Sequence, residues 1–331
     1  MLTVLKRLTL IASLLAPQVA TSAEFPVQVS HKYGTTEITS EPSRVVSLSF
    51  IGHDFLLALG VVPHALRMWY GPHPFGVWPW AQDALGDGEP IVMRGELDIE
   101  AIAAMKPDLI VGQWSGMTES DYALLSRIAP TIAPKEGWGD YGAPWDEMLR
   151  TLGVATGRSD TAEGHIARIN ARFALIRAAH PEWQGASAVT VWSGRVGAYT
   201  ARDIRGQFLA ELGFKEPDAL RDVGIFEGFY KIIPEEVTDP IDADALIWLD
   251  SGTNVEKINS LPLRHTMRAN QEGREIYLGL DETAAISHAS PLSIDYTLDF
   301  LVPLLEAAMD GDPTTEVSSS RAAGILPEVS Q

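Results

Sequence analysis

The sequence predicts an α/β protein built from two similar lobes that one long helix joins. Three observations predict this fold. Short apolar, β-branched runs alternate with helical patterns along the chain. A single helical stripe of apolar residues runs through the middle of the chain. Motifs of the first half then recur, in the same order, in the second half. With 331 residues, the chain is long enough for two medium-sized cores.

The first half alternates strands with helices in the spacing of a parallel sheet. Gly60, with Pro63 beyond it, ends one helical pattern, and residues 106–108 lead from another helix directly into a strand. Strands are predicted at 44–49 and 109–111, and helices at 54–59, 99–105 and 146–156.

The helix in the middle of the chain is predicted from its apolar spacing. Asp160 stands at the expected start, with Glu163 placed to close a capping box, and Pro181 follows the end. About 20 residues at ~1.5 Å each give a rod roughly 30 Å long, the width of a small domain. The apolar residues recur at spacings of 4, 3, 4 and 3, on one helix face: Ala162, Ile166, Ile169, Phe173 and Ile176.

The second half repeats the first. Residues 208–214 repeat the helix–glycine–apolar pattern of 56–61, and residues 243–252 repeat 107–116. In both longer copies, eight positions separate an aspartate from the last glycine, and a glutamate stands eight positions before that aspartate. A strand at 188–192 and a helix at 292–309 complete this half. Three repeats in one order predict two similar lobes.

The N-terminus has the pattern of a secretory signal. Lys6 and Arg7 precede an apolar run at 8–16, and small residues follow at 21–23. We expect an exported monomer in a Gram-negative periplasm, without a stable membrane anchor because there is no Cys to carry a lipid. The expected divisions are a signal peptide at 1–23, lobes at 24–157 and 183–310, the joining helix at 158–182, and a flexible tail at 311–331.

Composition and motifs exclude several function classes. The absence of Cys excludes disulfides, zinc–thiolate sites and a cysteine nucleophile. The formal charge of −19 disfavours nucleic acid as a partner. The sequence contains no dinucleotide fingerprint, phosphate loop or nucleophile elbow, so we expect no enzyme. The eight histidines show no paired metal-ligand spacing, so no metal site is expected.

Aromatic residues recur just after the predicted strands of both halves. Ligands of open α/β sheets bind beyond the carboxyl ends of the strands, where Trp and Tyr offer a large, rigid contact area. Arginines accompany these aromatics and could hold an anionic group. We expect the ligand to contact Trp69, Tyr70, Trp78, Trp114, Trp138, Tyr141, Trp192, Arg195, Tyr199, Arg202, Arg205, Tyr230, Trp248 and His288.

An ordered set of motifs carries a family resemblance over roughly residues 40–305. The set comprises the segments 42–48, 57–63, 99–110, 129–133 and 145–153, the long helix, Glu235–Glu236, and 289–293. Together they resemble the periplasmic substrate-binding proteins of ABC importers for ferric siderophores, whose relatives bind cobalamin and haem. The resemblance implies two Rossmann-like lobes, one interlobe helix and a shallow cleft that opens only slightly.

The resemblance also implies a function and two docking points. The protein would capture a ferric siderophore and deliver it to an inner-membrane ABC permease. Iron would arrive already chelated, so no cofactor and no protein ligand to the iron is implied. One glutamate on each lobe would engage permease arginines: Glu100 on the first lobe, and either Glu235 or Glu236 on the second.

Other functions stay open at this point. A haem carrier would recruit an axial ligand, for which His53, His288 and Tyr70 are candidates. Cobalamin is a further possible cargo. An exported enzyme acting on an aromatic or sugar-like ligand would need a carboxylate pair facing the cleft. A sensor subunit would dock a receptor instead of an importer.

Overall fold

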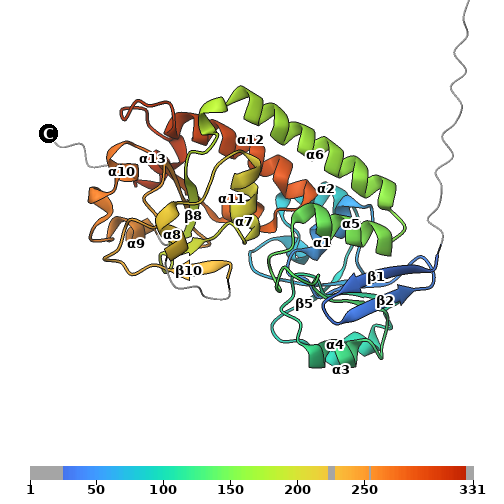
Figure 1. Cartoon of the computed structure of the whole chain (residues 1–331). Coiled ribbons are helices and arrows are strands. Elements are labelled where there is room, and N and C mark those ends of the chain that lie inside the picture. The colour runs from blue at the N-terminus through green and yellow to red at the C-terminus, as the bar shows by residue number, and fades with distance from the viewer. Residues whose placement is uncertain (1–24, 223–227, 253–254, 326–331) are drawn as a thin grey trace, which may run out of the picture.

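The computed structural model describes residues 25–222, 228–252 and 255–325, so the predicted signal peptide lies outside the described residues. Two α/β lobes lie side by side, and one long helix, α6 (Ser159–Ala179), runs along both of them (Figure 1). This arrangement confirms the predicted fold class.

The first lobe contains a five-stranded parallel sheet. Its strand order is β5-β4-β3-β6-β7, so the first strand of the sheet in sequence lies at its centre. The central strands are buried on both faces, which explains their unbroken apolar runs. The strands are β3 (Val45–Ser47), β4 (Ala65–Arg67), β5 (Ile91–Met93), β6 (Leu109–Val111) and β7 (Thr131–Ile132).

Helices and one hairpin surround this sheet. The hairpin is antiparallel and packs through its first strand on α5 and β7. The elements are β1 (Val27–His31), β2 (Gly34–Ile38), α1 (Gly52–Ala58), α2 (Gln82–Leu85), α3 (Ile99–Ala104), α4 (Glu119–Leu125) and α5 (Trp145–Ala155), with short 3₁₀ turns η1 (Pro74–Gly76) and η2 (Pro79–Ala81).

The second lobe repeats the strand order of the first. Its order is β10-β9-β8-β11-β12, again with the first strand at the centre. Strand β9 pairs antiparallel with both β8 and the edge strand β10, which the sequence repeats did not indicate. The strands are β8 (Ala188–Trp192), β9 (Gly197–Tyr199), β10 (Tyr230–Ile232), β11 (Ala245–Leu249) and β12 (Glu275–Leu278).

The remaining helices cover the second sheet. They are α7 (Ile204–Glu211), α8 (Asp218–Asp222), α9 (Val255–Asn259), α10 (Arg268–Gln271), α11 (Leu280–His288) and α12 (Pro291–Ala308), with 3₁₀ turns η3 (Pro181–Trp183) and η4 (Arg264–Thr266). Helix α12 contacts both α1 of the first lobe and α6, so it also links the two lobes.

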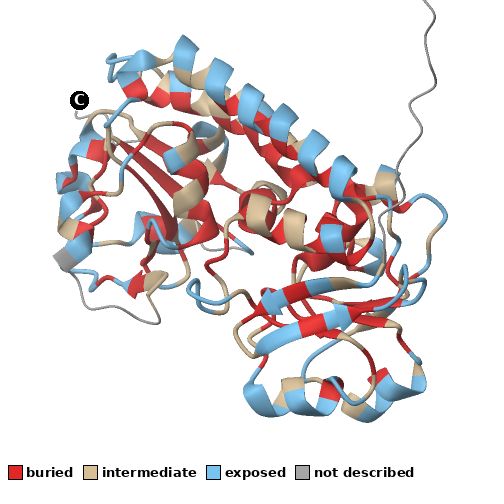
Figure 2. Ribbon diagram, turned by 45° about the vertical axis from the view of Figure 1, so that its right-hand side comes forward, coloured by how far each residue is buried: buried red, intermediate tan, exposed pale blue. Residues whose placement is uncertain are grey.

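Helix α6 buries the face that the sequence predicts. Ala162, Ile166, Ile169 and Phe173 are buried, and the opposite face is exposed to solvent (Figure 2). The predicted capping box is wrong. The helix begins without a side-chain cap, and Glu163 instead accepts a hydrogen bond from Arg150, with Nε and Oε1 2.9 Å apart.

The repeated aspartates make the same contacts in both lobes. Asp108 accepts hydrogen bonds from the backbone N–H and the hydroxyl of Ser43, both at 2.8 Å. Asp244 accepts from the same two groups of Ser187, at 2.8 and 2.9 Å. Burial opposes the charged forms, but these hydrogen bonds outweigh burial and lower the pKa of both carboxyls. Each aspartate thereby joins the start of its lobe's central strand to the start of the neighbouring strand.

The C-terminal segment differs from the prediction. Residues Ser318–Ala323 form a helix, α13, that packs on β12, and Val317 and Ile325 are buried. The expectation of a flexible tail from residue 311 is therefore wrong for 317–325. Composition suggested a loose segment because few apolar side chains anchor it, among them Val317, Ala323 and Ile325. Within the described part of the chain, no helix combines the length and apolarity that a membrane span needs.

Candidate functional site

The candidate site begins where the two central strands of the first sheet end. Phe50 follows β3 and Trp114 follows β6. These two strands are neighbours, and the strand order runs in opposite directions on either side of them. The ring centroid of Trp69 lies 6.2 Å from that of Phe50 and 5.1 Å from that of Trp114. Trp114 has a φ of +54°, a strained backbone conformation that is concentrated at functional sites. The Nε1–H of Trp114 donates to the carbonyl of Tyr141 at 2.8 Å, which fixes the ring.

The second lobe supplies the opposite wall. A cleft of about 200 Å³ lies between the lobes. Four of its lining residues belong to the first lobe and four to the second: Phe50, Trp69, Trp114 and Tyr141 face Tyr199, Asp203, Arg205 and Phe229. Tyr141 and Phe229 meet across it, with ring centroids 5.6 Å apart. The structure therefore builds an aromatic cleft from both lobes.

A buried ion pair carries the charge of this cleft. Arg205 donates through Nη1 to both carboxylate oxygens of Asp203, at 2.8 and 2.9 Å, and through Nε to Ser287 at 2.9 Å. Its guanidinium lies over the ring of Tyr199, 4.0 Å from the centroid, and 6.0 Å from that of Trp69. Among the described residues, Nη2 makes no hydrogen bond, which leaves this donor to a ligand oxygen.

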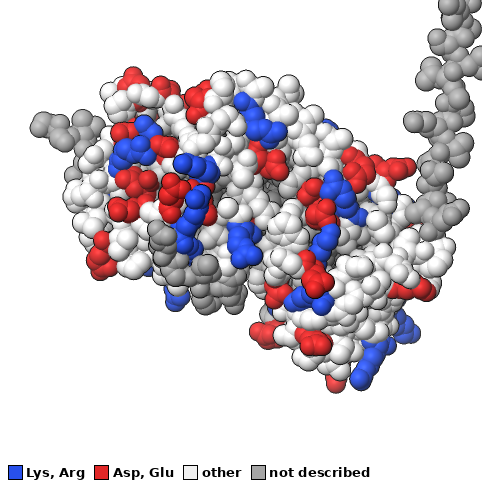
Figure 3. All heavy atoms as spheres, viewed as in Figure 1, with Lys and Arg blue, Asp and Glu red and all other residues white. Residues whose placement is uncertain are grey.

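The guanidinium of this pair is held charged and the neighbouring tyrosines neutral, while burial raises the pKa of the Asp203 carboxyl. Burial opposes the charged guanidinium, but Asp203 outweighs it and raises the pKa of Arg205. Burial raises the pKa of Tyr199 and raises that of Tyr230 to about 12. The tyrosine hydroxyls therefore remain hydrogen-bond donors at neutral pH. Acidic and basic side chains are interspersed over the outer face (Figure 3), so this local charge, and not a broad field, would orient a ligand.

A larger cavity of about 600 Å³ lies between residues 137–144 and 201–211, two segments that also contribute residues to the cleft. It is lined by Gly137, Trp138, Pro144, Ala201, Arg202, Gln207, Ala210 and Glu211. Gln207 Nε2 donates to the carbonyls of Gly142 and Arg202, at 2.8 and 3.1 Å. Gln207 thereby links Gly142, the neighbour of the cleft residue Tyr141, to Arg202, the neighbour of the cleft residue Asp203.

The structure brings half of the predicted ligand residues to these cavities. Trp69, Trp114, Tyr141, Tyr199 and Arg205 line the cleft, and Trp138 and Arg202 line the larger cavity. Tyr70 and Tyr230 lie behind the lining, with ring centroids 4.8 Å from Trp69 and 5.1 Å from Tyr199. Trp192 and the exposed Arg195 line neither cavity.

Three predicted ligand residues lie in the core, which corrects the prediction for this conformation. Trp78 stacks on Trp80, with ring centroids 5.4 Å apart, and is 1% exposed. Trp248 is fully buried because it lies on a central strand, and its Nε1 donates to Glu275 at 2.8 Å. His288 is also fully buried, as is His53, so neither can reach a haem in the cleft as the structure has it.

Three residues that line the cleft were missed by the sequence analysis: Phe50, Asp203 and Phe229. Phe50 stands three residues after a central strand, so its position at the carboxyl end could have identified it. Asp203 is the N-cap of α7, and its side chain accepts from the N–H of Arg205 at 2.9 Å. Its capping position alone suggested no role in a site.

The predicted docking glutamates are all exposed. Glu100 lies in the first turn of α3, next to the capping residue Asp98. Glu235 and Glu236 lie in the turn that follows β10. In Figure 1, α3 and β10 lie on the side of the molecule away from α6. Their role in docking stays a prediction.

Known proteins share this architecture. The family model of the periplasmic binding proteins matches residues 45–281. The probable siderophore-binding lipoprotein YfiY of Bacillus subtilis is 30% identical over 233 residues, which is 66% of this chain and 67% of that protein.

Solved structures extend the likeness to most of the chain. A periplasmic solute-binding protein of Mycobacterium smegmatis is 33% identical, with a TM-score of 0.75, over 86% of this chain and 99% of that one. PiaA of Streptococcus pneumoniae, solved in complex with ferrichrome, is 27% identical, with a TM-score of 0.73 and the same coverage of 86% and 99%. On the family match and on this shared two-lobed fold, the chain belongs to the periplasmic binding protein family.

Proposed function

We propose that this protein captures a ferric siderophore in the cleft between its lobes and delivers it to an inner-membrane ABC importer. The observation that carries the proposal is the convergence of aromatic rings from both lobes on one buried arginine. Such rings can hold the organic shell of a chelated iron, and the free Nη2 of Arg205 can bind a chelator oxygen. YfiY, named a siderophore-binding protein, and PiaA, solved with ferrichrome, support this assignment.

The remaining parts of the proposal concern location and cofactors. The protein works in the periplasm as a monomer, without a lipid anchor because the sequence holds no Cys to carry one. It needs no cofactor, because the siderophore already supplies the ligands of the iron. Of the described residues that line the cleft, Asp203 is the one carboxylate, and Arg205 binds both of its oxygens. The carboxylate pair that a glycosidase-like enzyme needs is therefore not built from these residues.

The cargo needs more room than the cleft offers in this conformation. Small-molecule pockets have volumes of about 300–1,000 Å³, whereas the cleft holds about 200 Å³. The larger cavity beyond the Gly142–Arg202 contact holds about 600 Å³. We infer that a bound siderophore separates these two segments and joins the cavities, so that Trp138 and Arg202 also contact it.

Tryptophan fluorescence tests the proposal. Addition of the correct ferric siderophore should quench the emission saturably at one equivalent, because Trp69 and Trp114 line the cleft. Ferric hydroxamate, catecholate and carboxylate siderophores would each be titrated. Trp114→Ala should weaken binding by about 1–2 kcal/mol, or about 5–30-fold.

The matched control is Trp192→Ala, which removes a half-buried tryptophan that lines neither cavity. Its affinity should equal that of the unmodified protein. Absence of quenching and of calorimetric heat with all three siderophore classes would contradict the proposed function.

A further inference from the structure

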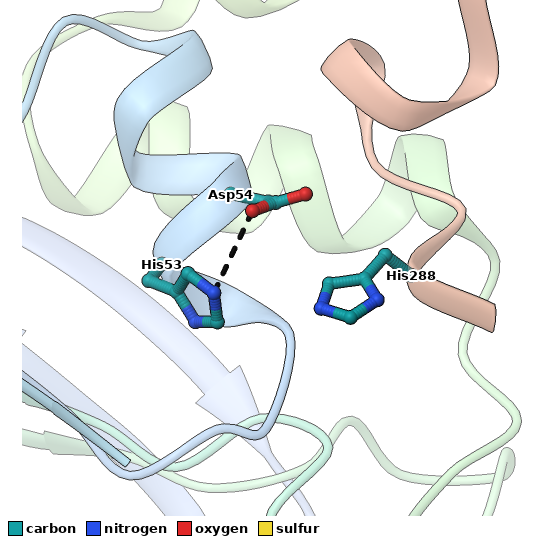
Figure 4. Close-up of side chains that lie close together, drawn as sticks. All are labelled: His53, Asp54 and His288. Atoms are coloured by element: carbon teal, nitrogen blue, oxygen red, sulfur yellow. Dashed lines mark ion pairs between the residues drawn. The ribbon is translucent and has the colours of Figure 1, made fainter. Parts of the chain in front are cut away.

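Two histidines and an aspartate meet in the core between the lobes. His53 and Asp54 open α1 of the first lobe, and His288 ends α11 of the second. Their exposed fractions are 1%, 0% and 0%. Figure 4 shows the ring of His288 pointing from the end of α11 toward the other two side chains. One potential ligand atom from each residue lies within 4.8 Å of the others.

One ring nitrogen of His288 is held by a hydrogen bond, and the other keeps a free lone pair. Its Nδ1 lies 2.8 Å from the carbonyl oxygen of Ala284. A carbonyl oxygen can only accept, so Nδ1 carries the proton and Nε2 of the neutral ring is an acceptor. Nε2 is buried and has no partner among the described residues. A histidine that donates through one nitrogen to a carbonyl while the other stays open is oriented as metal-ligating histidines are.

Asp54 is oriented in the same way. Its Oδ2 accepts hydrogen bonds from Trp80 Nε1 at 2.6 Å and from the hydroxyl of Ser290 at 2.9 Å. Its Oδ1 is buried without a hydrogen-bond partner in the described chain and lies 3.6 Å from Nε2 of His53. One oxygen is thus held by the surrounding protein, and the other is left to the cluster.

His53 completes the set. Neither of its ring nitrogens has a hydrogen-bond partner in the described structure, although both are buried. The alternative to a metal site is an ion pair between a protonated His53 and Asp54. Burial opposes a charged imidazole more strongly than Asp54 favours it, and so lowers the pKa of His53.

We propose that His53, Asp54 and His288 form a binding site for a divalent transition-metal ion, with Zn²⁺ as the probe. Two neutral imidazoles and one carboxylate are a ligand set that such ions take, with a further position left to water. One cation would satisfy at once a nitrogen of each histidine and Oδ1 of Asp54, whereas the ion pair would leave His288 Nε2 unsatisfied. This revises the sequence-based expectation of no metal site, because the ligands come from segments far apart in the chain.

Binding one ion requires the three side chains, whose ligand atoms lie within 4.8 Å of one another, to move closer together. Ligand atoms about 2.0–2.1 Å from a tetrahedral ion lie roughly 3.3 Å from one another. The His53–Asp54 pair, at 3.6 Å, is already close to this separation. The ion would join α1 to the α11–α12 junction. Its position is one ring behind the cleft, because the ring centroids of His288 and Trp69 are 5.8 Å apart.

Metal binding by the full-length chain tests this proposal independently of siderophore binding. After chelator treatment, Co²⁺ should bind at one equivalent and give the visible absorption of a tetrahedral site, and Zn²⁺ should displace it. His288→Gln and Asp54→Asn should each weaken binding by more than about 100-fold, since each removes a direct ligand and loss of a supporting contact alone costs 10–100-fold. Zn²⁺ should also raise the melting temperature of the unmodified chain but not that of the variants.

The control is His73→Gln, which removes a histidine that also pairs with a carboxylate, Asp281, at 3.2 Å, but at the surface. Its metal affinity should be unchanged. If the core variants do not fold, a crystal of the unmodified chain soaked in Zn²⁺ decides the matter, with an anomalous peak expected between the three side chains. No saturable Co²⁺ binding, unaltered binding in both core variants, or a peak only at surface residues would overturn the proposal.

Discussion

Replacement of Glu100, Glu235 and Glu236 together by alanine is expected to abolish siderophore-dependent iron uptake in cells while the purified protein keeps its ligand affinity. All three are exposed, on α3 of the first lobe and after β10 of the second, and none lines the cleft. Charge-assisted bonds from both lobes to permease arginines would set the register of docking, so their loss removes delivery but not capture. Radioactive iron uptake and fluorescence titration measure the two effects separately.

A control variant with the same charge change replaces Asp160, Glu163 and Glu182, exposed acids on α6 and the turn after it. These lie on the side away from α3 and β10 (Figure 1) and should leave uptake intact. Single Glu235→Ala and Glu236→Ala variants would show which of the two docks. Normal uptake by the triple variant, or loss of its ligand affinity, would show that the docking surface has been misplaced.

Asp203→Ala is expected to lower the free energy of unfolding by about 3–5 kcal/mol, because it leaves the guanidinium of Arg205 buried and unpaired. The side chain of Arg205 is 4% exposed and that of Asp203 is 1% exposed, so both are almost fully buried. Ligand affinity should fall as well, since Asp203 holds Arg205 over Tyr199. Urea unfolding followed by circular dichroism measures the stability, and fluorescence titration measures the affinity.

The double variant Asp203→Ala/Arg205→Met separates the two effects. It should recover most of the lost stability, because no unpaired charge remains, but not the ligand affinity, because Nη2 is gone. The surface ion pair of Arg150 and Asp146 on α5 is the comparison, and Asp146→Ala should cost no more than about 1 kcal/mol. If Asp203→Ala lowers the free energy of unfolding no more than Asp146→Ala does, or if the double variant keeps full ligand affinity, the role assigned to the Asp203–Arg205 pair is contradicted.

The sequence predicted the regular parts of the fold because periodicity reports burial directly. The strand at 109–111 and the strand at 188–192 have the predicted bounds, and α6 begins one residue after and ends three residues before the predicted range 158–182. The repeat around Asp108 and Asp244 predicted two similar lobes, and in the structure both aspartates accept a hydrogen bond from a serine hydroxyl. The edge strand β10 and the helix α13 could not be predicted, since each is held by a segment distant in the sequence, β9 and β12 respectively.

The sequence identified the residue types that form the site but not which of those residues are buried in the core. The rule that ligands bind beyond strand ends identified Trp69, Trp114 and Tyr199. The same rule included Trp78 and Trp248, which are aromatic and near strand ends but point into the core. Nothing in a single sequence distinguishes a ring that faces the cleft from one on the opposite face of the same segment. The cluster around His288 was missed because His288 lies more than 200 positions from His53 and Asp54, which are adjacent.

The most direct test of the account is the position of iron in a crystal of the protein with the ferric siderophore that quenches its fluorescence. Data collected at the iron absorption edge should show one anomalous peak between the ring of Trp114 and the guanidinium of Arg205, with siderophore oxygens as its ligands. An iron outside the space between the two lobes, or one bound there directly by protein side chains, would contradict the account.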